Sequence, residues 1–131
     1  MNKKVTILAL ALLVGVGTAL AGGGKEKTVA GTLVDSKCFL MNAKNAGNDH
    51  MTPKGTMNSC GTACAKMGIP VSLLTAEGRV FTIVVPAPQL ADHVGREAKV
   101  SGMLKEGSLI PAKIMVKAGD EWQEVKLATM M

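Results

Sequence analysis

The second half of the chain alternates between apolar and polar residues, and this pattern limits its fold more than any other feature of the sequence. The segments that are apolar, β-branched or alternating are 71–75, 79–85, 96–105, 109–117 and 122–127. Glu77-Gly78, Glu106-Gly107 and Gly119-Asp120 lie in the gaps between them, and glycine at such positions is typical of tight turns. The pattern predicts consecutive antiparallel strands rather than a helical bundle.

The phase of the alternation predicts which side chains face the core. The expected inward residues are Ala98, Val100, Gly102 and Leu104 in one strand and Ile110, Ala112, Ile114 and Val116 in the next. An earlier strand is expected over residues 28–35, where Gly31 indicates a bend or a close approach of two backbones.

A short helix is expected among these strands. Pro88 begins the segment PQLADHV and Gly95 follows it, which is how these two residue types are usually placed at helix ends. His93, near the end of this segment, is expected to be exposed. A helix between the third and fourth strands of a small barrel is the OB-fold arrangement. The sequence therefore predicts a mainly β chain, a small OB-like antiparallel barrel with one or two short helices. Another small antiparallel sandwich or barrel is the alternative.

The first 21 residues have the three parts of a secretory signal peptide. Asn2-Lys3-Lys4 is the basic start, residues 5–20 are the apolar stretch, and Ala19-Leu20-Ala21 is a small-residue cleavage site. Cleavage after Ala21 predicts a periplasmic or secreted protein that keeps no membrane span. A retained membrane anchor is the alternative, although the apolar stretch is at the lower limit of what spans a bilayer.

One domain is expected over residues 28–131, after a disordered lead over 22–27. An insertion, residues 36–68, follows its first strand and shows no strand pattern. Residues 42–56 are rich in Asn, Gly and Lys and predict a loop. A short helix is expected over residues 60–67, with a glycine directly after it.

The insertion contains all three cysteines of the chain and one of its two histidines: Cys38, Cys60, Cys64 and His50. Cysteines four residues apart, as in C-x3-C, lie on one face of a helix. Three thiolates and one imidazole form a tetrahedral zinc set, and a thioether from Met51 or Met41 favours Cu(I). The first hypothesis is therefore a small secreted binding protein that holds a soft metal ion, copper or zinc, through this Cys/His cluster.

The same cysteines support two other hypotheses. In an oxidising compartment two of three cysteines usually pair, and a Cys38–Cys64 or Cys38–Cys60 disulfide would staple the insertion to the barrel. The chain would then be a structural or protein-interaction module, with an envelope protein as partner and one thiol left over. A thiol redox protein with Cys60 or Cys64 as nucleophile is the third hypothesis. Without a metal, Met57 and Met67 are expected to be core residues.

Composition argues against several other functions. Aromatic residues make up 2% of the chain, and two of the lysines behind its formal net charge of +5 belong to the N-terminal segment. An OB barrel that binds single strands needs stacking aromatics in a basic groove, so nucleic acid is not an expected partner. No nucleophile elbow or glycine-rich phosphate loop is present, so the chain is not predicted to be an enzyme.

Several motifs together resemble a group of uncharacterised small secreted bacterial proteins. The motifs are GTLVDSKCFLM, NDHM, CGTACAKMGIPVSLL, VPAPQLADHVG and VSGMLKEGSLIPAKI. Members of the group share a D-S-x-C motif, a Cys-x3-Cys motif and an OB-like β domain. The resemblance implies a secreted, β-rich domain and no particular activity. The recurring polar and thiol positions of the group map to Asp35, Cys38, His50, Cys60 and Cys64.

Overall fold

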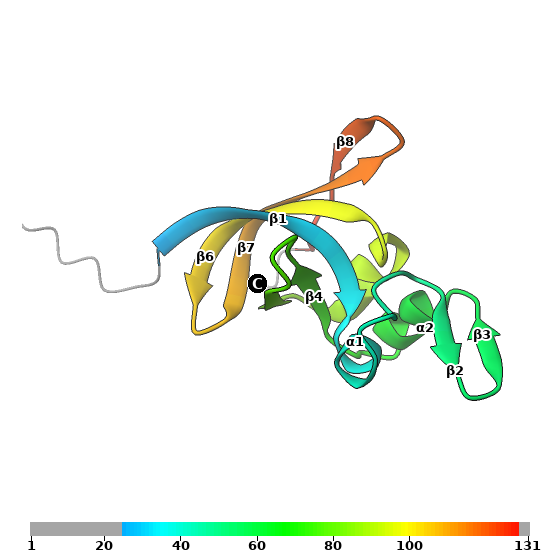
Figure 1. Ribbon diagram of the computed structural model, residues 1–131. Helices are drawn as coiled ribbons and strands as arrows, with labels where there is room; N and C mark the ends of the chain where they lie inside the picture. Colours follow the sequence, from blue (N-terminus) through cyan, green and yellow to red (C-terminus); the bar gives the residue numbers. More distant parts are fainter. Residues whose placement is uncertain (1–24, 129–131) are drawn as a thin grey trace, which may run out of the picture.

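The computed structural model describes residues 25–128, which form a mainly β structure, as the sequence predicted (Figure 1). The expected signal peptide, residues 1–21, lies outside the described residues. In chain order the elements are β1 (Lys25–Asp35), α1 (Ser36–Met41), β2 (His50–Thr52), β3 (Gly55–Met57), α2 (Cys60–Lys66), β4 (Val71–Leu74), β5 (Val80–Ile83), the 3-10 helix η1 (Ala87–His93), β6 (Glu97–Lys105), β7 (Ser108–Ala118) and β8 (Glu121–Glu124). None of the described helices has both the length and the apolar character needed to cross a bilayer.

Hydrogen bonds join five of the strands into a ring. The sheet order is β5-β4-β1-β6-β7-β8, and β5 also pairs with β7. The ring is antiparallel except between β5 and β7, which run parallel where Thr82 and Ile83 meet Ser108 and Leu109. The helix η1 joins β5 to β6, where the sequence predicted a helix. This connectivity agrees with the OB-like expectation, and β8 pairs with the far part of β7 as an extra strand.

The interior of the ring holds the apolar core. One buried side chain from each of the five ring strands and one from η1 illustrate it: Leu33, Leu73, Ile83, Val100, Ile114 and Leu90. Each such side chain contributes about 1.5–3 kcal/mol when it leaves water, so this core is the main source of stability.

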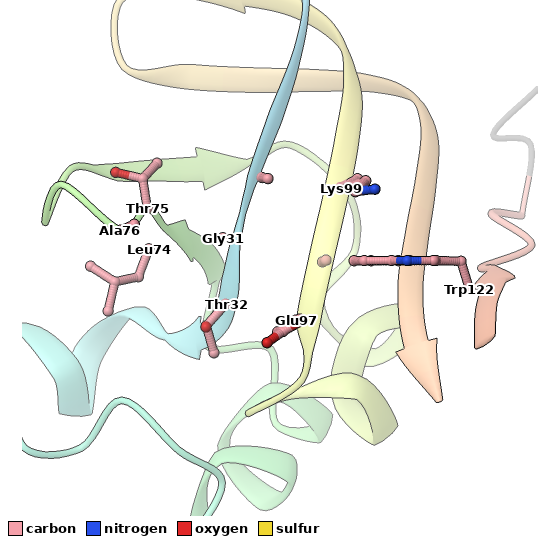
Figure 2. Close-up of a pocket in the computed structure, with 10 residues that line it drawn as sticks. Gly31, Thr32, Leu74, Thr75, Ala76, Glu97, Lys99 and Trp122 are labelled. Carbon is pink, nitrogen blue, oxygen red and sulfur yellow. The ribbon is translucent and has the colours of Figure 1, made fainter. Parts of the chain in front are cut away.

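β1 is longer than the sequence predicted. Residues 25–32 pair with β6, so Lys25, Glu26 and Lys27 are strand residues and not part of a disordered lead. The last part of β1 pairs with β4 instead. Near this change of partner a Cβ on Gly31 would overlap the backbone carbonyl of Leu74, which confirms the predicted close approach (Figure 2).

A β-bulge in β7 changes the predicted inward face. The pairing of β6 with β7 slips between Ser101 and Gly102, so Ala112 has no partner across the ladder. The extra residue shifts the alternation by one. Leu109 is therefore buried, whereas Ile110 and Ala112 are exposed, and the prediction that these two face inward is wrong. In β7 the predicted inward face is correct only beyond the bulge, at Ile114 and Val116, whereas the inward residues predicted for β6 are buried or half-buried.

The insertion between β1 and β4 is built from short elements. It contains α1, the hairpin of β2 and β3, and α2, which lie together at the end of β1 (Figure 1). The hairpin occupies residues 50–57, so the loop predicted over 42–56 is only partly correct. Strands of three residues are too short to show an alternating pattern, which explains why the sequence did not reveal them. The helix predicted over 60–67 is confirmed as α2.

Candidate metal centre

The three cysteines and His50 converge beside the end of β1. The sulfurs of Cys38 and Cys60 and a ring nitrogen of His50 all lie within 4.8 Å of one another. A second group shares Cys38, because its sulfur, the sulfur of Cys64 and a carboxylate oxygen of Asp35 also lie within 4.8 Å of one another. We call the first group the inner triad and the second the outer triad.

The structure thus contains a Cys/His cluster within metal-binding reach, as the sequence predicted. The four predicted ligands do not form one group. Cys38, His50 and Cys60 make up the inner triad, whereas Cys64 belongs to the outer triad. Asp35 was not among the predicted ligands. The position of Asp35 in the D-S-x-C motif, three residues before Cys38, is the sequence signal that could have suggested this residue.

The imidazole of His50 is buried and has one nitrogen without a partner. Its side chain is 1% exposed, Nε2 lies 3.0 Å from the carbonyl oxygen of Gly47, and Nδ1 makes no hydrogen bond. A carbonyl only accepts, so Nε2 carries the proton and donates it, and Nδ1 keeps its lone pair. This is the arrangement of a metal-ligating histidine whose other nitrogen is held by an outer partner.

The loop before His50 is fastened to the start of α2. Asn48 accepts the backbone N–H of Gly61 through its carbonyl oxygen at 2.9 Å and that of Thr62 through Oδ1 at 2.8 Å. The first N–H groups of a helix have no partner inside the helix, so Asn48 acts as an external cap. Because Asn48 lies only two residues before His50, this capping fixes the imidazole relative to Cys60.

Asn48→Ala is expected to lower the free energy of unfolding of the metal-free protein by about 1–2 kcal/mol, as for the loss of a helix cap. Urea denaturation followed by circular dichroism measures this change. Asn58→Ala is the control, because Asn58 is exposed and should change the free energy by less than about 0.5 kcal/mol. Equal effects of the two substitutions would contradict the capping role of Asn48.

Asp35 lies at the junction of β1 and α1 and is 1% exposed. Its Oδ1 accepts the N–H groups of Lys37 at 2.9 Å and Cys38 at 3.2 Å, which caps α1 and fixes the backbone of Cys38. Its Oδ2 has no hydrogen-bond partner. A buried polar atom left without a partner costs about 1–3 kcal/mol, so this oxygen is free to face a cation or a proton.

Burial raises the pKa of the Cys38 and Cys64 thiols, and the Asp35 carboxylate raises both further. For Cys64 the pKa rises to about 12. Both groups are therefore protonated at neutral pH in the metal-free protein. A catalytic cysteine needs the opposite shift, because the thiolate is the nucleophile. The raised pKa of Cys64 argues against this cysteine as a redox nucleophile.

Iodoacetamide at pH 8 is expected to modify Cys64 in the folded, metal-free protein at least about tenfold more slowly than in the urea-unfolded chain. The raised pKa leaves few thiolates in the folded state, and partial burial adds to the effect. Mass mapping of the alkylated peptides over time measures the rate at this cysteine. Equal rates in the folded and unfolded chain would contradict the raised pKa.

The methionines of the insertion are exposed. Met51 and Met41, the expected auxiliary ligands, are 59% and 77% exposed. Met51 follows His50 in β2, and successive strand side chains point to opposite faces, so Met51 faces away from the buried imidazole. Met57 and Met67 are 52% and 76% exposed, so the expectation that they are core residues without a metal is wrong.

The cysteines are free thiols among the described residues. The disulfides that the sequence allowed, Cys38–Cys60 and Cys38–Cys64, are therefore not shown.

The second histidine, His93, lies in η1 and belongs to neither triad. It is half-buried rather than exposed as predicted. Burial and the nearby Arg96 lower its pKa, so it does not favour the charged form that a helix C-terminus would favour.

A separate hollow of about 410 Å³ lies between β1, β4 and β6 (Figure 2). Small residues such as Gly31 and Ala98 line it, and Trp122 lies at its edge. The ammonium of Lys99 lies 4.3 Å from the centroid of the Trp122 ring, a cation–π contact. No cysteine or histidine lines this hollow, so it is distinct from the Cys/His cluster.

Comparison of the chain with protein-family models, curated proteins and solved structures finds no match. The class of the protein therefore rests on its own fold and site. It is a mainly β chain with a closed ring of strands and a Cys/His cluster at metal-binding distance.

Proposed function

We propose that this chain is an exported metal-binding protein that holds one soft metal ion, copper or zinc, at Cys38, His50 and Cys60. The observation that carries the proposal is the buried imidazole of His50, which has a ring nitrogen within 4.8 Å of two cysteine sulfurs and an Nδ1 without a hydrogen-bond partner. Imidazole nitrogen and thiolate sulfur are ligands for both metals. The N-terminal segment with the features of a signal peptide supports export.

The surrounding groups suit the binding of a cation. The described residues contain three buried side-chain polar atoms without a hydrogen bond, and two of them, His50 Nδ1 and Asp35 Oδ2, belong to the two triads. A cation at the inner triad would engage the nitrogen directly and would lie near the carboxylate that sits beside Cys38. It would offset part of the cost of leaving these atoms unpaired.

Metal binding requires that the thiols lose their protons. The raised pKa of Cys38 means that a metal ion must displace a proton there, so the affinity should increase as the pH rises. Because a metal ion ties α1, β2 and α2 together, it should also stabilise an insertion that has little apolar core of its own.

Titration of reduced protein with Zn(II), and separately with Cu(I), against a chromophoric chelator tests the proposal. The wild-type chain should bind one equivalent. His50→Ala should weaken binding by more than about a hundredfold, because it removes a direct ligand rather than a residue that only contacts a ligand. His93→Ala is the matched control, since it removes the other histidine of the chain and should leave the affinity unchanged. Equal affinities of the two variants would overturn the site.

A further inference from the structure

We propose that the metal is Cu(I) and that the thioether of Met57 is a further ligand to it beside the inner triad. This inference rests on the proposed metal site and adds to it the identity of the ion and one more residue.

The pairing of β2 with β3 places Met57 on the same face as the buried imidazole. His50 is the direct partner of Met57 across the ladder, and Met51 is the partner of Thr56. Directly opposed residues of an antiparallel pair project from one face, with Cβ atoms about 4.5–5.5 Å apart. Adjacent residues of one strand project from opposite faces. Met57 therefore lies beside His50, whereas Met51 lies on the other side of the hairpin.

The side chain of Met57 can reach the triad from the solvent side. It is 52% exposed, and every residue of β3 is exposed, so the core does not hold this thioether in place. Methionine has three rotatable bonds and adapts its position easily. Cys60 follows Met57 by only three residues, so one short segment supplies both a thioether and a thiolate near the imidazole.

The ligand set favours Cu(I) over Zn(II). The inner triad supplies one imidazole nitrogen and two sulfurs, and Met57 adds a third sulfur as a weaker ligand. Soft thiolate and thioether donors select Cu(I). Zinc sites in proteins use thiolate, imidazole and carboxylate donors, so a thioether contributes little to zinc binding. The loss of this thioether should therefore affect the two metals differently.

The test compares Met57→Leu with Met51→Leu, because leucine keeps an apolar side chain of similar volume and removes the sulfur. Cu(I) affinity is measured by competition with bathocuproine disulfonate in the presence of a reductant, and Zn(II) affinity with a fluorescent zinc chelator. Met57→Leu should weaken Cu(I) binding by about tenfold and change Zn(II) binding less than twofold. Met51→Leu should change neither affinity.

A spectroscopic measurement keeps the inference testable if the affinity changes are small. In selenomethionine-labelled protein loaded with Cu(I), selenium-edge X-ray absorption should show a copper neighbour, and Met57→Leu should remove it. A wild-type chain that binds Cu(I) with no copper–selenium neighbour, and with no effect of Met57→Leu, would overturn this inference and leave the proposed metal site intact. A chain that binds only Zn(II) would also overturn it. Failure to bind either metal would overturn the proposed function itself.

Discussion

Cys60→Ser is expected to abolish tight metal binding, whereas Cys64→Ser is expected to weaken the metal affinity much less. The sulfur of Cys60 belongs to the inner triad with His50, and the sulfur of Cys64 belongs to the outer triad with Asp35. The loss of an outer partner, a group that contacts a metal ligand without binding the metal, typically weakens metal binding 10–100-fold. The loss of a direct ligand should weaken metal binding more than that. We expect a loss of more than about a hundredfold for Cys60→Ser and of about tenfold, the lower end of the range for an outer partner, for Cys64→Ser.

Competition titration of the two reduced variants with the same metal measures this difference. The two cysteines lie in one helix, and serine has nearly the same shape, so each substitution is the other's control. The unfolding midpoints of the metal-free variants separate a lost ligand from a lost fold. Equal losses of affinity would contradict the division into two triads and would favour one site that uses all three cysteines.

Gly31→Val is expected to lower the free energy of unfolding by about 3 kcal/mol, one of the largest effects available from a single substitution in this chain. A Cβ at this position would overlap the backbone of Leu74, and backbone cannot move aside as a flexible side chain can. The strain falls where β1 changes partner from β6 to β4, so it acts on the ring itself. The midpoint of thermal unfolding should fall by about 10 °C or more.

The matched control for this substitution is Gly47→Ala. A Cβ on Gly47 would meet nothing within 4 Å, and its carbonyl would still accept the hydrogen bond from His50. We expect a change of less than about 0.5 kcal/mol. A tolerated valine at Gly31 would mean that β1 and β4 do not approach as closely as the structure describes.

Much of the barrel could be predicted from the sequence because its signals are local. Alternation over nine or more residues identifies β6 and β7, and the turn between β4 and β5 ends with Gly78, which has the positive φ expected of it. The bulge at Ala112 could not be predicted in this way. It depends on how β7 pairs with Gly102, a contact between two strands that the alternation of either strand does not contain.

The site shows the same division between local and non-local information. The sequence predicted one short helix that contains both Cys60 and Cys64, and the structure confirms it. Their spacing could not tell which of the two joins His50, because that depends on the loop fastened by Asn48. Met51 was expected as an auxiliary ligand because its thioether suits Cu(I), and this reason cannot tell one methionine of the insertion from another. Side chains of adjacent residues in a strand point to opposite faces, whereas side chains of directly paired residues across a hairpin point to the same face. Only the pairing register of the two strands identifies the residue opposite His50.

The most direct test of the metal site is the intact mass of the mature protein, purified without chelators and recorded under native and denaturing conditions. Alkylation of the denatured protein counts its free thiols. We predict a native mass that is heavier by one metal ion, and alkylation of Cys38, Cys60 and Cys64 once the protein is denatured. A metal-free mass with a single alkylated cysteine would contradict the account. The cluster would then be a disulfide that staples the insertion to the barrel.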